Sequence, residues 1–568
     1  MERAEATPDG ASNQPVGQRL VLVESSRFPV REWLSRMSAQ DQLRLAIEQE
    51  QRRLANDVPS DREAAILALL RVQAHAPHAD RPFPVPDVIA GNRLADPGGN
   101  LALRLWFESN GNEPGRTVDS PTGELDRWGS RFLDTCGRLA EAEVVLAQCE
   151  SGFMRLVDDG AGTFDAWIAT KRASGGWRER LDFDRWAAHL AGRHRAVLDS
   201  ITSSRLGPAA SAPSREATSL READVRLETM ANQIVYPSDA QIDGCTVQTY
   251  RDVLRLLIAR ALRAEDLGDL VSLSSERELS DTIASTLAVD HVQASRAVAA
   301  FTVDEANAGW HSAVPGVPAA PLVRIAPDLL ALSHYGLTTG PLLFLTRELR
   351  RRAGPAYHDT AWLREDVFRR DLYGLFPDRR FVTSDRRIEL RRDRGDVRTD
   401  VDAVVFDRKT GTLGVFELKS QDPFARSVAE RTRQRDNVLF ANRQISGVLD
   451  WLSRHGADDL LGRIDSRAAK RFRAHKVYPF VLGRYLAHFA DGPEPDRRAA
   501  WGTWAQVLQL RNGRPDPFSA ADPISSLHAR LQDATPLTGL ADAAPSRSLD
   551  LGAIRLVVHP SRAAFRER

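Results

Sequence analysis

Three charged residues in the C-terminal half have the types and the spacing to bind a metal ion. Asp402, Glu417 and Lys419 lie in the segment TDVDAVVFDRKTGTLGVFELKSQ, residues 399–421. Two runs rich in β-forming residues flank a four-residue loop that contains glycine, which is the pattern of a β-hairpin. Counting back from this loop, we predict that Asp402 pairs with Glu417 and that Lys419 projects from the same face as Glu417.

The predicted pair of carboxylates has a chemical consequence. Residues that pair across antiparallel strands have Cβ atoms roughly 4.5–5.5 Å apart. Two carboxylates at that distance in a half-buried place repel each other unless a cation lies between them. Because oxygen ligands suit hard divalent ions, the pair predicts a Mg²⁺ or Mn²⁺ site. The alternative interpretation is a surface hairpin with an ordinary ion pair.

The distribution of lysine points to the same hairpin. The chain has five lysines against 72 arginines, and four of the five lie within residues 409–476. Arginine does not replace lysine where a compact, titratable ammonium group is needed. The lysine at position 419 therefore indicates a specific chemical requirement.

Two further residues lie near the predicted pair. The periodicity predicts a helix from Thr360 to Phe376 that places Glu365 on its apolar face, where acids are rarely buried without a partner. Pairing with Arg369 at i+4 is one explanation. Gln421 follows Lys419 on the same face of the strand, where it either orients water or phosphate or is a polar strand end.

Two groups of basic residues are candidates for contacts with phosphate. A capping box at 427–430 predicts a helix that runs to about His455, with arginines in its first turns that oppose the helix dipole. The segment 463–476 has six basic residues against one acid. Phosphate contacts supply most nonspecific affinity for nucleic acids, whereas a solvated basic surface is the alternative. The candidate nucleic-acid-binding residues are Arg431, Arg433, Arg435, Lys470, Arg471, Arg473 and Lys476.

The strands of the hairpin are apolar on both faces along most of their length. Such strands form the central pair of a sheet that helices cover on both sides. From Asp359 the pattern reads helix, strands, helix, strand, and residues 477–486 predict the last of these strands. The order of elements is typical of an α/β domain.

This arrangement resembles the PD-(D/E)XK superfamily of nucleases over roughly residues 359–486. Asp402 matches the first acidic position of the family, and Glu417 with Lys419 matches its E-x-K. Asp400 resembles the acidic residue that often precedes the first position, although a Pro-Asp sometimes seen there is replaced by residues 399–401. In this superfamily the helix before the strands often lends a glutamate to the metal site, which implies that role for Glu365.

The resemblance also implies a fold and an activity. The expected fold is an α/β nuclease core, a central mixed sheet flanked by helices, preceded by a large and mainly α-helical region. The expected activity is Mg²⁺- or Mn²⁺-dependent hydrolysis of DNA phosphodiester bonds, in which Asp402, Glu417 and Lys419 are catalytic. Asp402, Glu417 and Glu365 would hold the metal, and Gln421 and Asp400 would be accessory. Nucleases of this kind with large helical extensions commonly belong to defence against foreign DNA.

Composition bounds the remaining possibilities. The chain has 568 residues with 77 basic and 77 acidic side chains, so its net charge does not indicate a nucleic-acid or membrane partner. The three cysteines lie far apart, which argues against a disulfide scaffold or a structural zinc site. Neither a signal peptide nor a membrane-spanning run is predicted, so we expect a cytoplasmic protein. The sequence contains no P-loop, dinucleotide-binding, GxSxG or HExxH motif.

The length predicts several domains. The expected boundaries are a disordered N-terminus at 1–18, a helical domain at 19–204, a linker at 205–218, a helical or mixed domain at 219–355, a nuclease-like domain at 356–490 and a C-terminal extension at 491–568. The N-terminal helical regions would select or gate the substrate, or mediate homo-oligomer or partner-protein contacts. Two alternatives stay open: a non-catalytic DNA-binding or assembly protein built on a nuclease fold, and a nuclease that acts on RNA or branched DNA.

Overall fold

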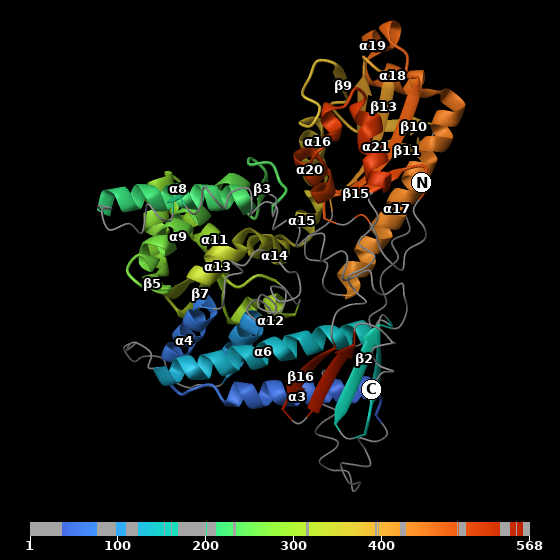
Figure 1. The fold of residues 1–568 in the computed structure, drawn as a ribbon. Coiled ribbons are helices and arrows are strands. Elements are labelled where there is room, and N and C mark those ends of the chain that lie inside the picture. The colour runs from blue at the N-terminus through green and yellow to red at the C-terminus, as the bar shows by residue number, and fades with distance from the viewer. Residues whose placement is uncertain are drawn as a thin grey trace.

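The computed structural model shows a chain folded into three domains (Figure 1). No described helix combines the length and the apolar content that a membrane-spanning segment needs. The structure describes residues 37–75, 98–109, 123–168, 200–201, 212–230, 234–313, 317–420, 428–485, 487, 496–533 and 546–559, except positions 151, 153, 161, 392–394, 396 and 553.

The first domain combines segments from both ends of the described chain. Its helices pack on one face of a four-stranded sheet of order β1-β2-β17-β16. Strands β2 and β17 are parallel neighbours, and each forms an antiparallel hairpin with its outer partner. Besides a helix at 98–108, the elements are α3 (Ala39–Asn56), α4 (Arg62–His75), α6 (Gly123–Glu150), β1 (Met154–Asp158), β2 (Thr163–Ile168), β16 (Arg547–Leu551) and β17 (Ile554–His559).

This arrangement differs from the domain boundaries expected from the sequence. The segment 19–204 contains a β-hairpin as well as helices, and the segment 491–568 is divided between two domains. The apolar run 549–558 folds as a hairpin in which Gly552 adopts a positive φ of 69°. A turn that depends on a single glycine gives a weak signal in an otherwise apolar run.

The middle domain is mainly helical with a small sheet of order β5-β8-β7-β6. Helix α4 of the first domain packs against this sheet and is apolar on all sides because it is covered on all sides. Helix α8 begins at Ala212, within the segment 205–218 that was expected to be a linker. The elements are α8 (Ala212–Met230), β3 (Gln241–Ile242), β4 (Cys245–Thr246), α9 (Val247–Glu265), β5 (Val271–Ser275), α10 (Glu276–Leu287), α11 (His291–Ala299), β6 (Thr302–Val303), α12 (Glu305–Ser312), β7 (Leu322–Ala326), β8 (Leu329–Ser333), α13 (His334–Thr339), α14 (Pro341–Ala353) and α15 (Pro355–Asp359).

The third domain is built around a mixed five-stranded sheet of order β15-β14-β13-β12-β9. Strands β9, β12 and β13 are antiparallel, whereas β13, β14 and β15 are parallel. The elements are α16 (Ala361–Tyr373), β9 (Phe381–Thr383), β10 (Ile388–Arg391), β11 (Val397–Val401), β12 (Ala403–Asp407), β13 (Thr412–Lys419), α17 (Val428–His455), α18 (Ala457–Ile464), α19 (Ser466–Arg471), β14 (Lys476–Gly483), β15 (Ala500–Thr503), α20 (Trp504–Asn512), the 3₁₀ helix η2 (Pro517–Ser519) and α21 (Pro523–Asp533).

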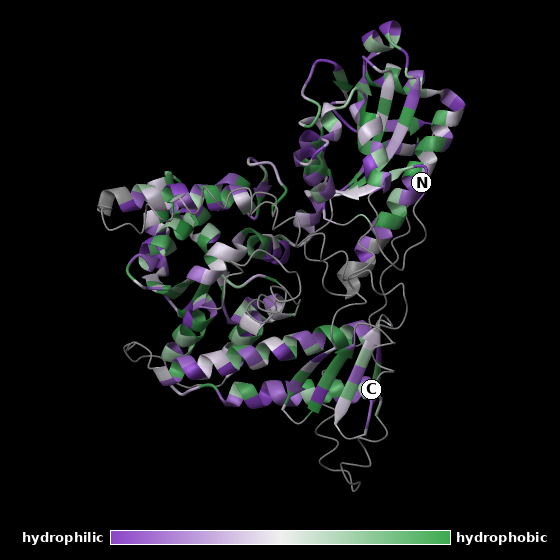
Figure 2. Cartoon of the chain, viewed as in Figure 1, coloured by the Kyte–Doolittle hydropathy of each residue, from purple (hydrophilic) through white to green (hydrophobic). Residues whose placement is uncertain are grey.

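The predicted hairpin is the centre of this sheet. Asp407 pairs with Thr412, and the register holds back to Ala403 opposite Phe416, as counted from the loop. One face of the sheet packs against α17 and α18, and the other packs against α16, α20 and α21. The prediction of a mixed sheet with helices on both faces is therefore confirmed for this domain. Figure 2 shows hydrophobic residues along its strands and both residue classes along helices such as α6.

The strand that carries Asp402 differs from the prediction. The chain bends at Asp402, which separates β11 from β12, and β11 pairs with β10 in a sheet of its own. Val401 consequently pairs with Ile388 and not with Leu418. The ladder between β12 and β13 ends at Ala403, so Asp402 is not directly paired with Glu417. A bend of this kind frees the aspartate side chain from the alternation that a continuous strand would impose.

Candidate functional site

Glu417 and Lys419 lie at the C-terminal end of β13, and their side chains form an ion pair. The Lys419 Nζ atom is 2.6 Å from Oε1 of Glu417, and the two residues share one face of the strand as predicted. The Glu417 side chain is only 1% exposed, and its Oε2 atom receives no hydrogen bond from the described residues. A buried carboxylate oxygen without a donor is costly, which makes it a candidate ligand for a cation.

Asp402 reaches the same place by a different route from the one predicted. Its carboxylate Oδ2 accepts a hydrogen bond of 2.8 Å from the backbone N–H of Leu418, which lies between Glu417 and Lys419. Arg369 of α16 donates from Nε to the carbonyl oxygen of Asp402 at 2.5 Å, which holds the bend. The prediction that Asp402 pairs with Glu417 in the strand register is therefore wrong, but the two carboxylates still meet beside one strand end.

Gln444 of α17 is a site residue that the sequence analysis missed. Its Oε1 atom accepts a hydrogen bond of 2.9 Å from Lys419 Nζ, and its Nε2 atom donates to Asp400 Oδ1 at 3.0 Å. Arg387 contacts the other oxygen of Asp400 at 2.9 Å. Gln444 and Asp400 thus form an outer layer that fixes the ammonium group of Lys419. No local motif distinguishes a glutamine in the middle of a 28-residue helix.

Glu365 of α16 belongs to the same group of charges. The charges that act on the Glu365 carboxyl are those of Asp402, Lys419, Arg387 and Arg369. The i+4 ion pair with Arg369 that the sequence offered as an alternative is not formed, because Arg369 contacts Asp366 and the Asp402 carbonyl instead. The Glu365 carboxyl therefore forms no direct ion pair with Arg369, and the charges of Asp402 and Lys419 act on it more strongly than that of Arg369.

The pKa values of this cluster follow from burial and mutual repulsion. Burial raises the pKa of Glu417 well above its usual range, and the neighbouring Asp402 adds to the effect while Lys419 opposes it. Burial likewise raises the pKa of Asp402. Burial also raises the pKa of Glu365, and the charge of Asp402 adds to that effect. Burial would lower the pKa of Lys419, but Glu417 and Asp402 outweigh it and raise that pKa. A cation placed among the carboxylates would relieve these shifts.

The donor set has the chemistry of a hard-cation site, although its ligands are not fully gathered. The Glu417 oxygen that lacks a donor belongs to a carboxylate close to Asp402, and Asp402 in turn lies close to Glu365. Carboxylate oxygens are the ligand type that suits Mg²⁺ or Mn²⁺. The described residues contain no group of three or more His, Cys, Asp or Glu side chains already arranged around one point. Lys419 contacts Glu417 directly, so a metal ion would share that carboxylate with the ammonium group.

The candidate phosphate-binding residues lie at two opposite ends of the sheet. Lys476 pairs with Thr412 at the start of β13, whereas Lys419 pairs with Gly483 at its end. Seven residues of strand separate the two ends by about 23 Å. Exposed Lys470, Arg471 and Arg473 lie with Lys476 at the far end, so the structure does not bring this group to the carboxylates.

The arginines of α17 lie at the same end of the sheet as Lys419. The first turns of this helix extend beyond the sheet toward the other two domains (Figure 1). Arg433 is exposed there. The side chains of Arg431 and Arg435, and all of Gln421, lie outside the described residues.

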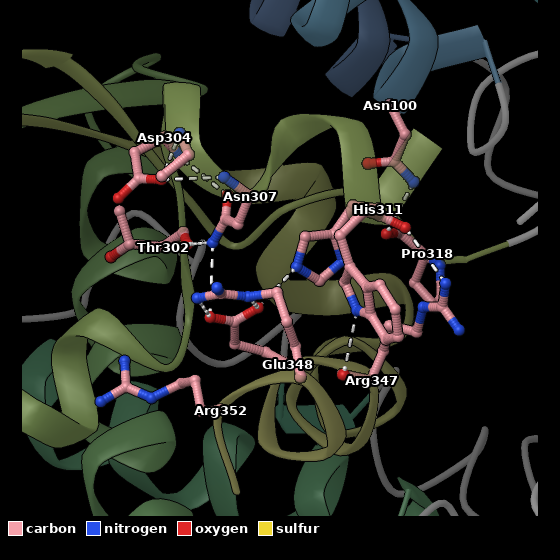
Figure 3. A network of polar contacts seen from close by, with 12 residues as sticks. Asn100, Thr302, Asp304, Asn307, His311, Pro318, Arg347, Glu348 and Arg352 are labelled. Carbon is pink, nitrogen blue, oxygen red and sulfur yellow. Dashed lines mark hydrogen bonds and ion pairs between the residues drawn. The ribbon is translucent and has the colours of Figure 1, made fainter. Parts of the chain in front are cut away.

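Two other polar clusters contain buried histidines. In the middle domain, buried Glu348 accepts hydrogen bonds from His311 Nε2 at 3.0 Å and Arg351 Nε at 2.9 Å, within the network in Figure 3. In the first domain, His559 contacts Ser546 through Nδ1 at 2.8 Å and Asp165 through Nε2 at 2.6 Å. Both histidines are fully buried, so no substrate reaches them, and both clusters serve to hold secondary-structure elements together.

Comparison of the chain with protein-family models, curated proteins and solved structures finds no match. The candidate site therefore rests on the residues themselves and on their geometry.

Proposed function

We propose that the protein is a metal-dependent nuclease that hydrolyses phosphodiester bonds of DNA at the end of β13. The observation that carries the proposal is the Oε2 atom of Glu417, which is buried and without a hydrogen-bond donor beside Asp402 and Lys419. Groups with perturbed pKa values that converge at one strand end are typical of reaction centres. The resemblance to PD-(D/E)XK nucleases in the motif residues supports the same activity.

The residues divide the chemistry between them. Asp402 and Glu417, with Glu365, would hold Mg²⁺ or Mn²⁺, which when bound polarises the scissile phosphate and lowers the pKa of a bound water. Lys419 would position that water and offset the charge that builds on the phosphoryl oxygens. Gln444 would keep the Lys419 ammonium in place through the hydrogen bond described above.

The position of the site supports control by the other domains. The end of the sheet that carries Lys419 points toward the first and middle domains, and α19 lies at the end that points away (Figure 1). Arg364 of α16 lies over the ring of Tyr236 in the middle domain at 5.7 Å, so the helix that carries Glu365 is also tied to that domain. We propose that these domains select or gate the substrate in a cytoplasmic enzyme of defence against foreign DNA.

The second candidate is a non-catalytic DNA-binding or assembly protein on a nuclease fold. The intact set of Asp402, Glu417 and Lys419 favours catalysis, because a binding protein has no need to bury two carboxylates beside a lysine. A further alternative keeps the nuclease activity but replaces the substrate by RNA or branched DNA.

One incubation series tests the proposal. Purified protein is mixed with duplex DNA, single-stranded DNA, junctions and RNA, each with Mg²⁺, Mn²⁺ or EDTA, and the products are separated on denaturing gels. We expect metal-dependent cleavage of DNA that disappears in EDTA and in Glu417→Ala. Equal cleavage by parent and Glu417→Ala would place the reaction elsewhere, and absence of cleavage under every condition would favour the non-catalytic candidate.

A further inference from the structure

Two exposed aromatic side chains lie beside the candidate site. In the described part of the chain, seven large hydrophobic residues are strongly exposed, and two of them are aromatic: Trp362 at 59% and Phe440 at 49%. Trp362 lies one helical turn before Glu365 on α16, and Phe440 lies one turn before Gln444 on α17. The aromatic members of this set therefore both lie on the helices that supply the site.

Phe440 also lies close to two cations, and the exposed Asp436 lies one turn before it on α17. The Lys419 Nζ atom lies 5.4 Å from the centroid of its ring, and the exposed Arg443 guanidinium lies 5.5 Å from it. Arg433 is two turns earlier on α17, which places it on the same stripe of the helix as Phe440. An exposed ring among cations combines a stacking surface for a base with charges for its phosphates.

The dimensions suit an unpaired strand. From Arg433 to Gln444 the helix rises about 16 Å. At 3.4 Å per nucleotide in a stacked strand, this length corresponds to about five nucleotides. Bases within a duplex are stacked on one another and present only their edges, so a ring on a helix surface can stack on a base only where the base is unpaired.

We propose that Phe440 and Trp362 are stacking platforms for the bases of single-stranded DNA. The strand would follow the stripe of Arg433, Phe440 and Arg443 along α17 to Lys419. The proposal rests on the proposed function and narrows its substrate to unpaired DNA: single strands, frayed ends or flaps. A protein partner would also cover two rings, but the two cations close to Phe440 favour a polyanion.

The test measures binding without cleavage. Full-length protein in EDTA is titrated into fluorescein-labelled single-stranded DNA of 20 nucleotides, into single-stranded RNA of the same length and into a DNA duplex of the same length, and anisotropy gives Kd for each. The variants are Trp362→Ala, Phe440→Leu, which removes the ring, and Phe440→Trp, which restores one. Leu267→Ala, an exposed apolar position of the middle domain, is the matched control.

We expect the parent to prefer the single strand, and Phe440→Leu and Trp362→Ala each to weaken that binding roughly tenfold, the scale of one stacked base. Duplex binding should stay within twofold, Phe440→Trp should restore the parent affinity, and Leu267→Ala should change nothing. Parent-like binding of the single strand by both ring-deleted variants, or an equal loss on duplex and single strand, would overturn the proposal. Tighter binding of single-stranded RNA than of DNA would overturn the assignment to DNA.

Failure of the stacking proposal and failure of the proposed function give different results. If the rings bind single strands and no condition gives cleavage, then the nuclease assignment fails while the platform stands. If Glu417→Ala abolishes cleavage but ring removal leaves binding unchanged, then the reverse holds.

Discussion

Replacement of Lys419 by arginine gives the sharpest test of the site, because it changes the shape of one cation and keeps its charge. The Lys419 side chain is 14% exposed, and its ammonium contacts Glu417 Oε1 at 2.6 Å and Gln444 Oε1 at 2.9 Å. A guanidinium is longer and planar, so it cannot occupy this position between two acceptors without moving them. Loss of a positioned catalytic group costs on the order of 10²-fold in rate, which is about 2.7 kcal/mol of activation free energy.

We therefore expect Lys419→Arg to cleave DNA about 10²-fold more slowly than the parent in single-turnover assays with Mg²⁺. Its free energy of unfolding in urea should change by less than about 1 kcal/mol, because the buried carboxylates keep a cation. Lys409→Arg is the matched control, because Lys409 is exposed in the hairpin loop at the other end of the strand. Parent-like cleavage by Lys419→Arg would refute the reasoning and reduce Lys419 to a counter-ion of Glu417.

Three further predictions follow from other contacts. Asp402→Ala and Glu417→Ala should each abolish cleavage and keep DNA binding within a few-fold in anisotropy measurements, because they remove the proposed metal ligands but no phosphate-binding cation. Parent-rate cleavage by either variant would exclude these ligands. Charge reversal at Lys470 and Lys476 should leave cleavage of oligonucleotides shorter than about six nucleotides unchanged, since about 23 Å of strand separates these lysines from the site. A tenfold slower rate would show that short substrates reach the far end. Arg380→Ala should lower the free energy of unfolding by about 3 kcal/mol in urea titrations at pH 7, because it leaves buried Asp407 without its cation. Burial would raise the pKa of Asp407, but its hydrogen bonds with Arg380 outweigh burial and lower that pKa, so the stabilisation is complete above about pH 4 and disappears as the pH falls through the folded pKa. An Arg380→Ala effect that persists unchanged well below that pKa would contradict this assignment.

The sequence predicted the centre of the third domain because local patterns decide it. The loop at 408–411 sets the register of β12 and β13, and apolar residues on both faces require cover on both sides. The same counting failed at Asp402, where Arg369 and the N–H of Leu418 hold a bend that no local pattern announces. Backbone capture by residues distant in sequence is visible only in three dimensions.

Two other features lay beyond sequence reasoning for the same reason. Gln444 joins the site through contacts 25 and 44 residues away in the chain, so its role depends on how α17 packs. The segment 491–568, expected only as a C-terminal extension, supplies strand β15 to the central sheet before α20 starts at Trp504. The short run at 500–503 becomes a strand because β14 offers it a parallel edge, which is a tertiary effect that overrides local propensity.

The pairing of β2 with β17 determines the order in which the protein can fold during synthesis. Asp165 and His559, joined across these strands, are separated by 394 residues of chain. At bacterial or eukaryotic elongation rates the ribosome needs roughly 20–80 s to add them. Throughout this interval β2 presents an unpaired inner edge, while the middle and third domains emerge as continuous segments that can fold on their own contacts. The first domain to be translated is thus the last to be completed, and any nascent chain released early carries an open sheet edge that invites aggregation.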